Sequence, residues 1–211
     1  MKLYKVLICI TLPIFLIMLF ASLLTTKQYL LLSKGQYESH EDITFDHDLA
    51  ADRIMGYLNY RYDTLEIDYN PDGEEILMRD TEITHMVDVK NLYTTLRLIA
   101  VGSLIIGVSL SVYMYNKNKR ELYNTLKLLP VAPILFIAFI GGYILIDFNT
   151  AFTTFHHLFF SNDDWILRYN DVLILLLPEM FWMVSGLIIL VLFSGSLGII
   201  YYLNGKYLKN A

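Results

Sequence analysis

Four long apolar stretches constrain this chain more than any other feature of its sequence. A helix needs about 20 predominantly apolar residues to cross roughly 30 Å of hydrocarbon. Stretches of this kind cover residues 6–24, 93–115, 128–146 and 181–203. Hydrophobic residues make up 55% of the 211-residue chain and the mean hydropathy is +0.47, which is too apolar for an ordinary soluble domain. The sequence therefore predicts an all-α membrane protein with four transmembrane helices.

The first stretch follows Lys2 and Lys5, so it also has the pattern of a cleaved signal peptide. It is longer than the apolar region of a usual signal peptide, however, and no clear A-x-A cleavage site follows it. We therefore expect this stretch to be retained as a span.

Lysine and arginine predict the orientation, because they accumulate in short cytoplasmic loops. Basic residues precede the first span, follow the last one and dominate the loop between the second and third: Lys2, Lys5, Lys117, Lys119, Arg120, Lys127, Lys206 and Lys209. Both termini are thus expected in the cytoplasm. The predicted division is 1–32, first span; 33–92, extracytoplasmic cap; 93–115, second span; 116–127, cytoplasmic loop; 128–147, third span; 148–180, extracytoplasmic segment; 181–203, fourth span; and 204–211, cytoplasmic tail.

The expected cap holds most of the 21 acidic residues of a chain whose net charge is −5. A charge-rich segment of this kind is also simply typical of a solvated face, and we expect no nucleic-acid partner. Asp46 or Asp48 is expected to cap a helix with an apolar face formed by Leu49, Ile54, Met55 and Leu58. Apolar and polar residues alternate in 65–69, a turn is indicated at 70–73, and a return segment follows at 75–78. This pattern predicts two strands. The sequence thus predicts a small α/β cap.

The sequence HMVDVK places His85 just before the second span. On a helix, His85 shares a face with Val89 and Tyr93, and Asp88 lies one turn away, where a carboxylate can hold the tautomer of a histidine. Arg97 lies one turn deeper and is expected to face protein or trapped water. In the simpler interpretation, His85 is a residue of the extracytoplasmic cap that makes an ordinary hydrogen bond.

The segment between the third and fourth spans, FTTFHHLFFSNDDW, combines His156 and His157 with many aromatic rings. The expected ring-bearing residues of a substrate pocket are Phe152, Phe155, Phe159, Phe160, Trp165 and Tyr93. The same rings could equally form an anchoring belt at the membrane surface. Because neighbours on a helix point about 100° apart, we expect only one of the two histidines to face a pocket.

Histidines before the second span and after the third lie at the same predicted surface, which permits acid–base chemistry on a lipid-linked substrate. The serine-elbow and H-E-x-x-H motifs are absent. The single cysteine, Cys9, lies in the first span, which excludes an internal disulfide and an extramembrane cysteine nucleophile. We expect no cofactor, although His85, Asp88, His156 or His157, and Asp163 leave a zinc site as a weaker alternative. Transport is disfavoured because the third and fourth spans contain no interior charge.

The motifs HMVDVK (85–90), FTTFHHLFFSNDDW (152–165) and LLPEMFW (176–182) together resemble the lipoprotein intramolecular transacylase family of Gram-positive bacteria. The resemblance covers most of the chain and implies a multi-pass enzyme of the cell membrane. Members of this family move the sn-2 acyl chain of a diacylglyceryl lipoprotein to the α-amino group of its N-terminal cysteine, which yields the lyso-form lipoprotein.

The resemblance also implies two catalytic histidines on the extracytoplasmic face. His85 matches the first, with Asp88 and Lys90 in its motif, whereas His156 and His157 both remain candidates for the second. The implied partners are diacylglyceryl-modified lipoproteins and membrane lipid. A non-catalytic membrane subunit, a lipid-binding sensor and a hydrolase of the same ester are the alternatives.

Overall fold

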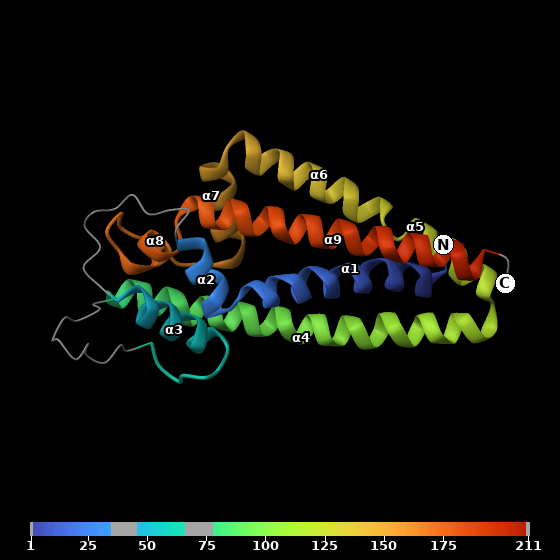
Figure 1. Ribbon diagram of the computed structural model, residues 1–211, viewed down its shortest axis with the longest axis horizontal. Coiled ribbons are helices and arrows are strands. Elements are labelled where there is room, and N and C mark those ends of the chain that lie inside the picture. Colours follow the sequence, from blue (N-terminus) through green and yellow to red (C-terminus); the bar gives the residue numbers. More distant parts are fainter. Residues whose placement is uncertain (1, 35–45, 66–77, 210–211) are drawn as a thin grey trace. The chain divides into compact units, whose positions relative to one another are not determined.

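The computed structural model describes residues 2–34, 46–65 and 78–209. Within these ranges the regular elements are all helices: α1 (Leu3–Leu24), α2 (Lys27–Lys34), α3 (His47–Leu58), α4 (Asp80–Lys117), α5 (Lys119–Leu128), α6 (Val131–Ile146), α7 (Phe148–Phe159), α8 (Val172–Leu176) and α9 (Glu179–Leu208) (Figure 1). Four helical segments are long and apolar enough to cross a membrane: Leu3–Leu24, Asp80–Lys117, Lys119–Ile146 and Glu179–Leu208. The chain is a multi-pass membrane protein, as the sequence predicts.

The chain divides into two compact units. Unit 1 comprises Met1–Ala21, Thr95–Phe155 and Leu187–Ala211, and unit 2 comprises Ser22–Thr94 and His156–Gly186. Helices α1, α4, α7 and α9 each contribute residues to both units.

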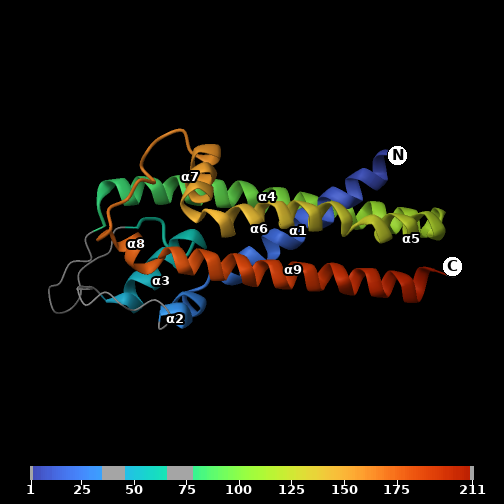
Figure 2. The same ribbon diagram turned by 90° about the horizontal axis from the view of Figure 1, so that it is seen from above.

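Unit 1 holds the most apolar helices. Its buried core joins α1, α4, α5 and α9 through Ile8, Met114, Leu122, Phe193 and Leu197. Helix α6 has no buried residue, although all its side chains except Tyr143 are apolar or glycine, so its surface requires lipid around it. Figures 1 and 2 both show the first turns of α1 and the last turns of α9 at the same end of this unit, beside α5.

A close helix–helix contact in unit 1 depends on Gly107 of α4. A Cβ atom built on this glycine would lie 2.7 Å from Cδ2 of Leu12 and 2.9 Å from Oγ1 of Thr11. A side chain at this position would force the Leu12 and Thr11 side chains of α1 to shift, and small residues are common where membrane helices meet closely.

Unit 2 has a separate core beneath α3. Asp46 caps this helix, accepting hydrogen bonds from the backbone N–H groups of Asp48 (2.9 Å) and Leu49 (3.1 Å). The apolar face predicted for α3 is buried against α8 and the first turns of α9, in a cluster that includes Ile54, Leu173 and Phe181. The predicted helix and one of its two candidate caps are therefore confirmed.

The predicted α/β character of the cap is not supported. The described part of residues 33–92 consists of helices joined by turns and irregular segments and contains no strand. Of the two expected strands, 65–69 and 75–78, only the end residues Leu65 and Met78 belong to the described ranges, and neither adopts strand structure. Leu65 is instead buried in the core beneath α3.

Candidate active site

The first turn of α4 is joined to α8 by one buried carboxylate. Glu82 is 0% exposed, and its Oε2 accepts a hydrogen bond (2.9 Å) from the backbone N–H of Arg79 at the helix start. Its Oε1 accepts another (2.9 Å) from the backbone N–H of Leu173 in the first turn of α8. Burial raises the pKa of Glu82 above its ordinary value. The carboxylate thus satisfies N–H groups at the starts of two helices, which lack partners within their own helix.

An ion pair strengthens the same junction. The Arg79 guanidinium donates two hydrogen bonds to Asp171, one of them from Nε to Oδ1 at 2.6 Å. Asp171 also accepts a bond (2.6 Å) from the backbone N–H of Arg168. The Arg79 hydrogen bonds hold the pKa of Asp171 below its usual range. The segment that precedes α8 is thereby held against the start of α4.

Two histidines meet beside this junction. His85, on α4, and His156, near the end of α7, have ring centroids 5.8 Å apart. Their side chains are 8% and 7% exposed, respectively. Both rings are therefore largely removed from water, yet close enough to act on the same small group.

Two aromatic rings enclose the pair. Trp165 stacks on His156, with centroids 4.9 Å apart and planes at 29°. Phe160 packs edge-on against His85 at 5.2 Å and also contacts His156 at 5.7 Å. These rings cover the histidines, so for Phe160 and Trp165 the structure favours the pocket interpretation over a lipid-facing belt.

His157 lies differently from its neighbour. Its side chain is exposed, and its ring meets the Trp165 ring edge-on at 5.1 Å and 88°. The sequence leaves the choice between the adjacent histidines open, whereas the structure brings His156 into contact with His85.

Burial dominates the electrostatics of His85, which precedes the predicted span at 93–115. It lowers the pKa of His85 to about 4, with a further lowering by the nearby His156, while the Asp88 and Asp164 carboxylates act in the opposite direction. His85 is consequently neutral at neutral pH. Among the residues that the structure describes, its buried Nδ1 atom has no hydrogen-bond partner, and neither does the buried Nε1 of Trp165. Two polar atoms in this cluster therefore have unused hydrogen-bonding capacity, which is uncommon for buried groups.

Asp88 is linked to the loop after α7. Its Oδ2 accepts a hydrogen bond (2.7 Å) from the Asn162 side chain. The carboxylate predicted to hold the His85 tautomer therefore connects α4 to the loop that carries Trp165, and it acts on His85 through its charge.

The other predicted site residues lie outside the ring cluster. Lys90 places its ammonium group 3.8 Å from the centroid of the Tyr57 ring and 4.7 Å from that of Tyr60. The Tyr93 hydroxyl shares a hydrogen bond with Thr25 (2.6 Å) and donates one to Ser22 (3.2 Å).

The remaining aromatic candidates are more exposed. Phe159 and Phe155 are both exposed, and Phe152 stacks on Phe148 at 5.7 Å. Phe152, Phe155 and Arg97 belong to unit 1, whereas the histidine pair belongs to unit 2.

Sequence reasoning missed Arg79, Glu82, Asn162 and Asp171. Asn162 lies within the 152–165 motif but has no catalytic side chain, and the partners that join these residues across the site are far away in sequence. Glu82, three residues after Arg79, occupies the position of the acidic residue in a capping box, which is the one local signal that could have identified it. In residues 2–34, 46–65 and 78–209, no three His, Cys, Asp or Glu side chains gather into a possible metal site.

Fold and site together define a multi-pass helical membrane protein that holds a buried histidine pair under aromatic rings. The model of the lipoprotein intramolecular transacylase (Lit) family matches residues 3–182 of the chain. The chain belongs to this family.

Two solved structures and one curated relative are similar to this chain. The fold is similar to the membrane-integral lipoprotein intramolecular transacylase Lit of Bacillus cereus, with a TM-score of 0.77, 24% identity and coverage of 99% of this chain and 95% of that one. A histidine-to-alanine variant of the same enzyme gives a TM-score of 0.71, 24% identity and coverage of 99% and 93%. An uncharacterized protein of Aquifex aeolicus is 30% identical over 135 residues, which are 56% of each chain, so the match spans just over half the length of that relative.

Proposed function

We propose that this protein transfers the sn-2 acyl chain of a diacylglyceryl lipoprotein to the α-amino group of the same molecule's N-terminal cysteine. The observation that carries the proposal is the buried contact between His85 and His156 under Phe160 and Trp165, in a chain that belongs to the transacylase family. The products are an amide at the N-terminus and a free hydroxyl on the glycerol.

The reaction needs a proton carrier and no enzyme nucleophile. The neutral amine attacks the ester carbonyl carbon, a C–N bond forms, and the C–O bond to the glycerol breaks. The amine loses one proton and the departing glycerol oxygen gains one, so a single imidazole that accepts and then releases a proton balances the step. Both reacting groups belong to one substrate, and the main task of the enzyme is to hold them together.

The two histidines suit different parts of this reaction. With a pKa of about 4, His85 stays neutral and can donate an N–H to the oxyanion that forms on the ester carbonyl. Proton transfer from the amine to the glycerol oxygen then falls to His156, whose ring lies 5.8 Å from that of His85.

The aromatic cover supports acyl transfer over hydrolysis. Phe160 and Trp165 pack directly on the histidine rings, and both histidines are almost completely buried. A site closed in this way keeps water away from the activated ester, so the amine competes successfully for the acyl group.

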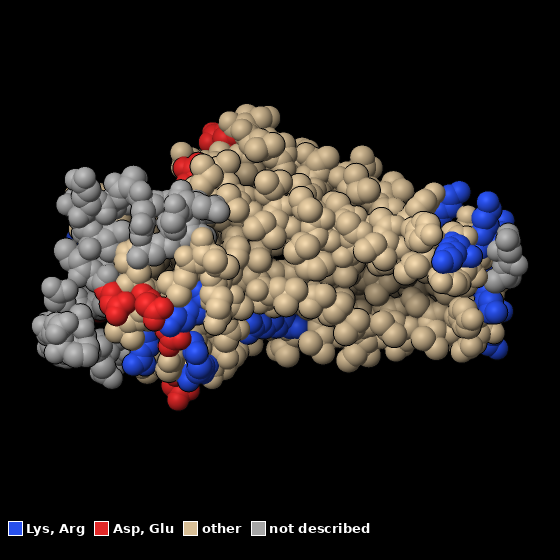
Figure 3. Space-filling view, in the orientation of Figure 1, with Lys and Arg blue, Asp and Glu red and all other residues tan. Residues whose placement is uncertain are grey.

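The orientation that we propose places this site on the extracytoplasmic face, with both termini in the cytoplasm. Figure 3 shows Lys and Arg gathered at the end of unit 1 where the last turns of α9 and the α5 region lie, with no acidic side chain visible there. Lys and Arg in short loops mark the cytoplasmic side of a membrane protein.

Purified protein incubated with a synthetic diacylglyceryl peptide tests the proposed function. Substrate and product have the same mass, so fragmentation must show whether the acyl chain is on the amine. The expected result is an N-acylated lyso peptide with unchanged total mass. Loss of one acyl chain from the peptide, with release of free fatty acid, would show a hydrolase instead. An unchanged substrate would contradict catalysis altogether.

A further inference from the structure

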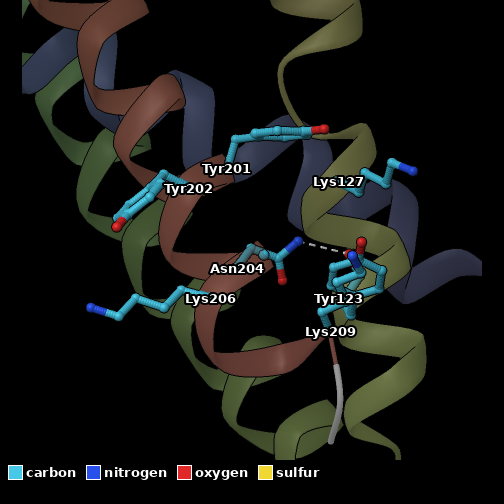
Figure 4. A pocket seen from close by; sticks show the side chains of 8 residues that line it. Tyr123, Lys127, Tyr201, Tyr202, Asn204, Lys206 and Lys209 are labelled. Atoms are coloured by element: carbon cyan, nitrogen blue, oxygen red, sulfur yellow. Dashed lines mark hydrogen bonds between the residues drawn. The ribbon is translucent and has the colours of Figure 1, made fainter.

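An open pocket in unit 1 is separate from the histidine pair. Its volume is about 550 Å³, and it lies between α5 and the C-terminal end of α9 (Figure 4). Its lining includes Tyr123, Lys127, Tyr201, Asn204, Lys206 and Lys209. None of these residues takes part in the proposed acyl transfer.

Asn204 is the buried centre of this pocket. The residue is 4% exposed, and its Nδ2 donates a hydrogen bond (2.9 Å) to the backbone carbonyl of Tyr123. This bond fixes the amide orientation, because the opposite one would set two oxygens against each other. The buried Oδ1 has no hydrogen-bond partner in the described parts of the chain. A ligand here is therefore expected to donate an O–H or N–H, since a buried acceptor without a donor is costly.

The charged lining of the pocket is entirely basic. Lys127, Lys206 and Lys209 line it, and no lining residue is acidic. The nearby Arg120 donates a hydrogen bond (2.7 Å) to the carbonyl of Lys209. The nearby Glu121 is paired with Lys2 and Lys5, at 3.4 and 3.2 Å. The lining thus favours an anion, and phosphate is the common one at such basic sites between membrane helices.

The surroundings favour a lipid as the source of this anion. Tyr201 and Tyr202 are exposed at the pocket, as tyrosines commonly are at the headgroup level of a bilayer. Apolar side chains remain exposed next to it on α9 and at the junction of α5 and α6, including Ile199, Leu128 and Val131. An acyl chain can lie on these surfaces while its headgroup occupies the pocket.

We propose that this pocket binds an anionic phospholipid whose headgroup also carries a hydroxyl group. Its phosphate faces the three lysines, and its hydroxyl donates to Oδ1 of Asn204. This combination selects a phosphatidylglycerol-type headgroup over zwitterionic lipids, which add a cation beside the lysines, and over phosphatidic acid, which lacks the glycerol hydroxyls.

Native mass spectrometry of the detergent-purified protein tests the lysines. We expect the wild type to retain phosphatidylglycerol about tenfold better than phosphatidylcholine. The double variant Lys206→Gln/Lys209→Gln should lose this preference. Lys117→Gln/Lys119→Gln, which removes two lysines outside the pocket lining, should keep it. Equal retention of the two lipids by the wild type, or equal loss in both double variants, would overturn the proposal. The lysines would then set the membrane orientation without binding a particular lipid.

A second comparison tests the buried amide. The wild type is expected to prefer phosphatidylglycerol to phosphatidic acid several-fold, and Asn204→Ala should abolish this difference while still preferring either lipid to phosphatidylcholine. An unchanged preference in the variant would overturn the role of Asn204. Displacement of phosphatidylglycerol by millimolar inorganic phosphate, which has no acyl chains, would identify a soluble phosphate site and overturn the lipid assignment.

Discussion

Burial separates the two adjacent histidines of α7. His156 is 7% exposed and contacts both His85 and Phe160, whereas His157 is exposed and touches the edge of Trp165. Successive side chains on a helix point about 100° apart, so His156 faces His85 while the neighbouring His157 points in a different direction. The chemistry we propose therefore belongs to His85 and His156.

Acidification is expected to destabilise the fold through His85. Its pKa is about 4 in the folded protein and 6.5 when unperturbed, so the unfolded chain binds the proton more tightly. The free energy of unfolding should fall as the pH drops from 6.5 to 4, by up to about 3 kcal/mol. Thermal unfolding in detergent across this range should show a smaller loss for His85→Gln than for the wild type.

Phe160→Leu is the control for this measurement. It loosens the packing around His85 without removing a titratable group, so it should lower stability at all pH values and keep most of the pH dependence. The same pH dependence in His85→Gln and the wild type would contradict a buried, neutral His85.

Contacts at the N-terminus of helix α4 position the site. Glu82 accepts N–H groups from the starts of α4 and α8, and Arg79 binds Asp171 just before α8. These contacts hold the segment that carries Trp165 close to the helix that carries His85. Two hydrogen-bonded helix starts and one ion pair thus set the geometry of the histidine pair.

Replacing Glu82 by Gln is expected to weaken this junction. Glutamine has one acceptor oxygen where Glu82 uses two, so one buried N–H loses its partner, at a cost of about 1–3 kcal/mol. Thermal unfolding should show the loss, and acyl transfer should slow because Trp165 is held less firmly. Asp80→Asn, at an exposed position in the same turn, should leave both unchanged. Equal stability of Glu82→Gln and the wild type would exclude this role.

Much of this architecture could be predicted from the sequence because it depends on local patterns. The apolar runs, the Asp46 cap and the apolar face of α3 are all visible within a few turns of chain. The Arg79–Asp171 pair and the Glu82–Leu173 bond join residues about 90 positions apart, and no local pattern specifies such partners. Likewise, the FHH motif is compatible with either histidine, and the contact of His156 with His85 depends on how α7 packs against α4.

At the scale of the whole molecule, most of the length of the four membrane-spanning helices belongs to one unit of the fold and the histidine pair belongs to the other. The core of unit 1 and its exposed apolar helices suit a membrane, whereas unit 2 has its own core and holds the histidine pair. If the orientation we propose is right, Ser161 is extracytoplasmic and Lys119 is cytoplasmic.

Cysteine labelling of intact cells tests this orientation. Cys9 is the only native cysteine, so a Cys9→Ser background carries either Ser161→Cys or Lys119→Cys, both at exposed positions. A membrane-impermeant maleimide should label the first variant at once and the second only after the cells are broken. Labelling of the Lys119→Cys protein alone in intact cells would reverse the orientation.

The central claim is that His85 and His156 perform the acyl transfer. Its most direct test is fragmentation of lipoprotein N-terminal peptides from cells that make diacylglyceryl lipoproteins and express the wild type or one alanine variant. Peptides from cells with the wild type or His157→Ala should carry the acyl chain on the amine. His85→Ala and His156→Ala should reduce this conversion about 100-fold or more. Full conversion by His156→Ala, with loss in His157→Ala, would contradict the account.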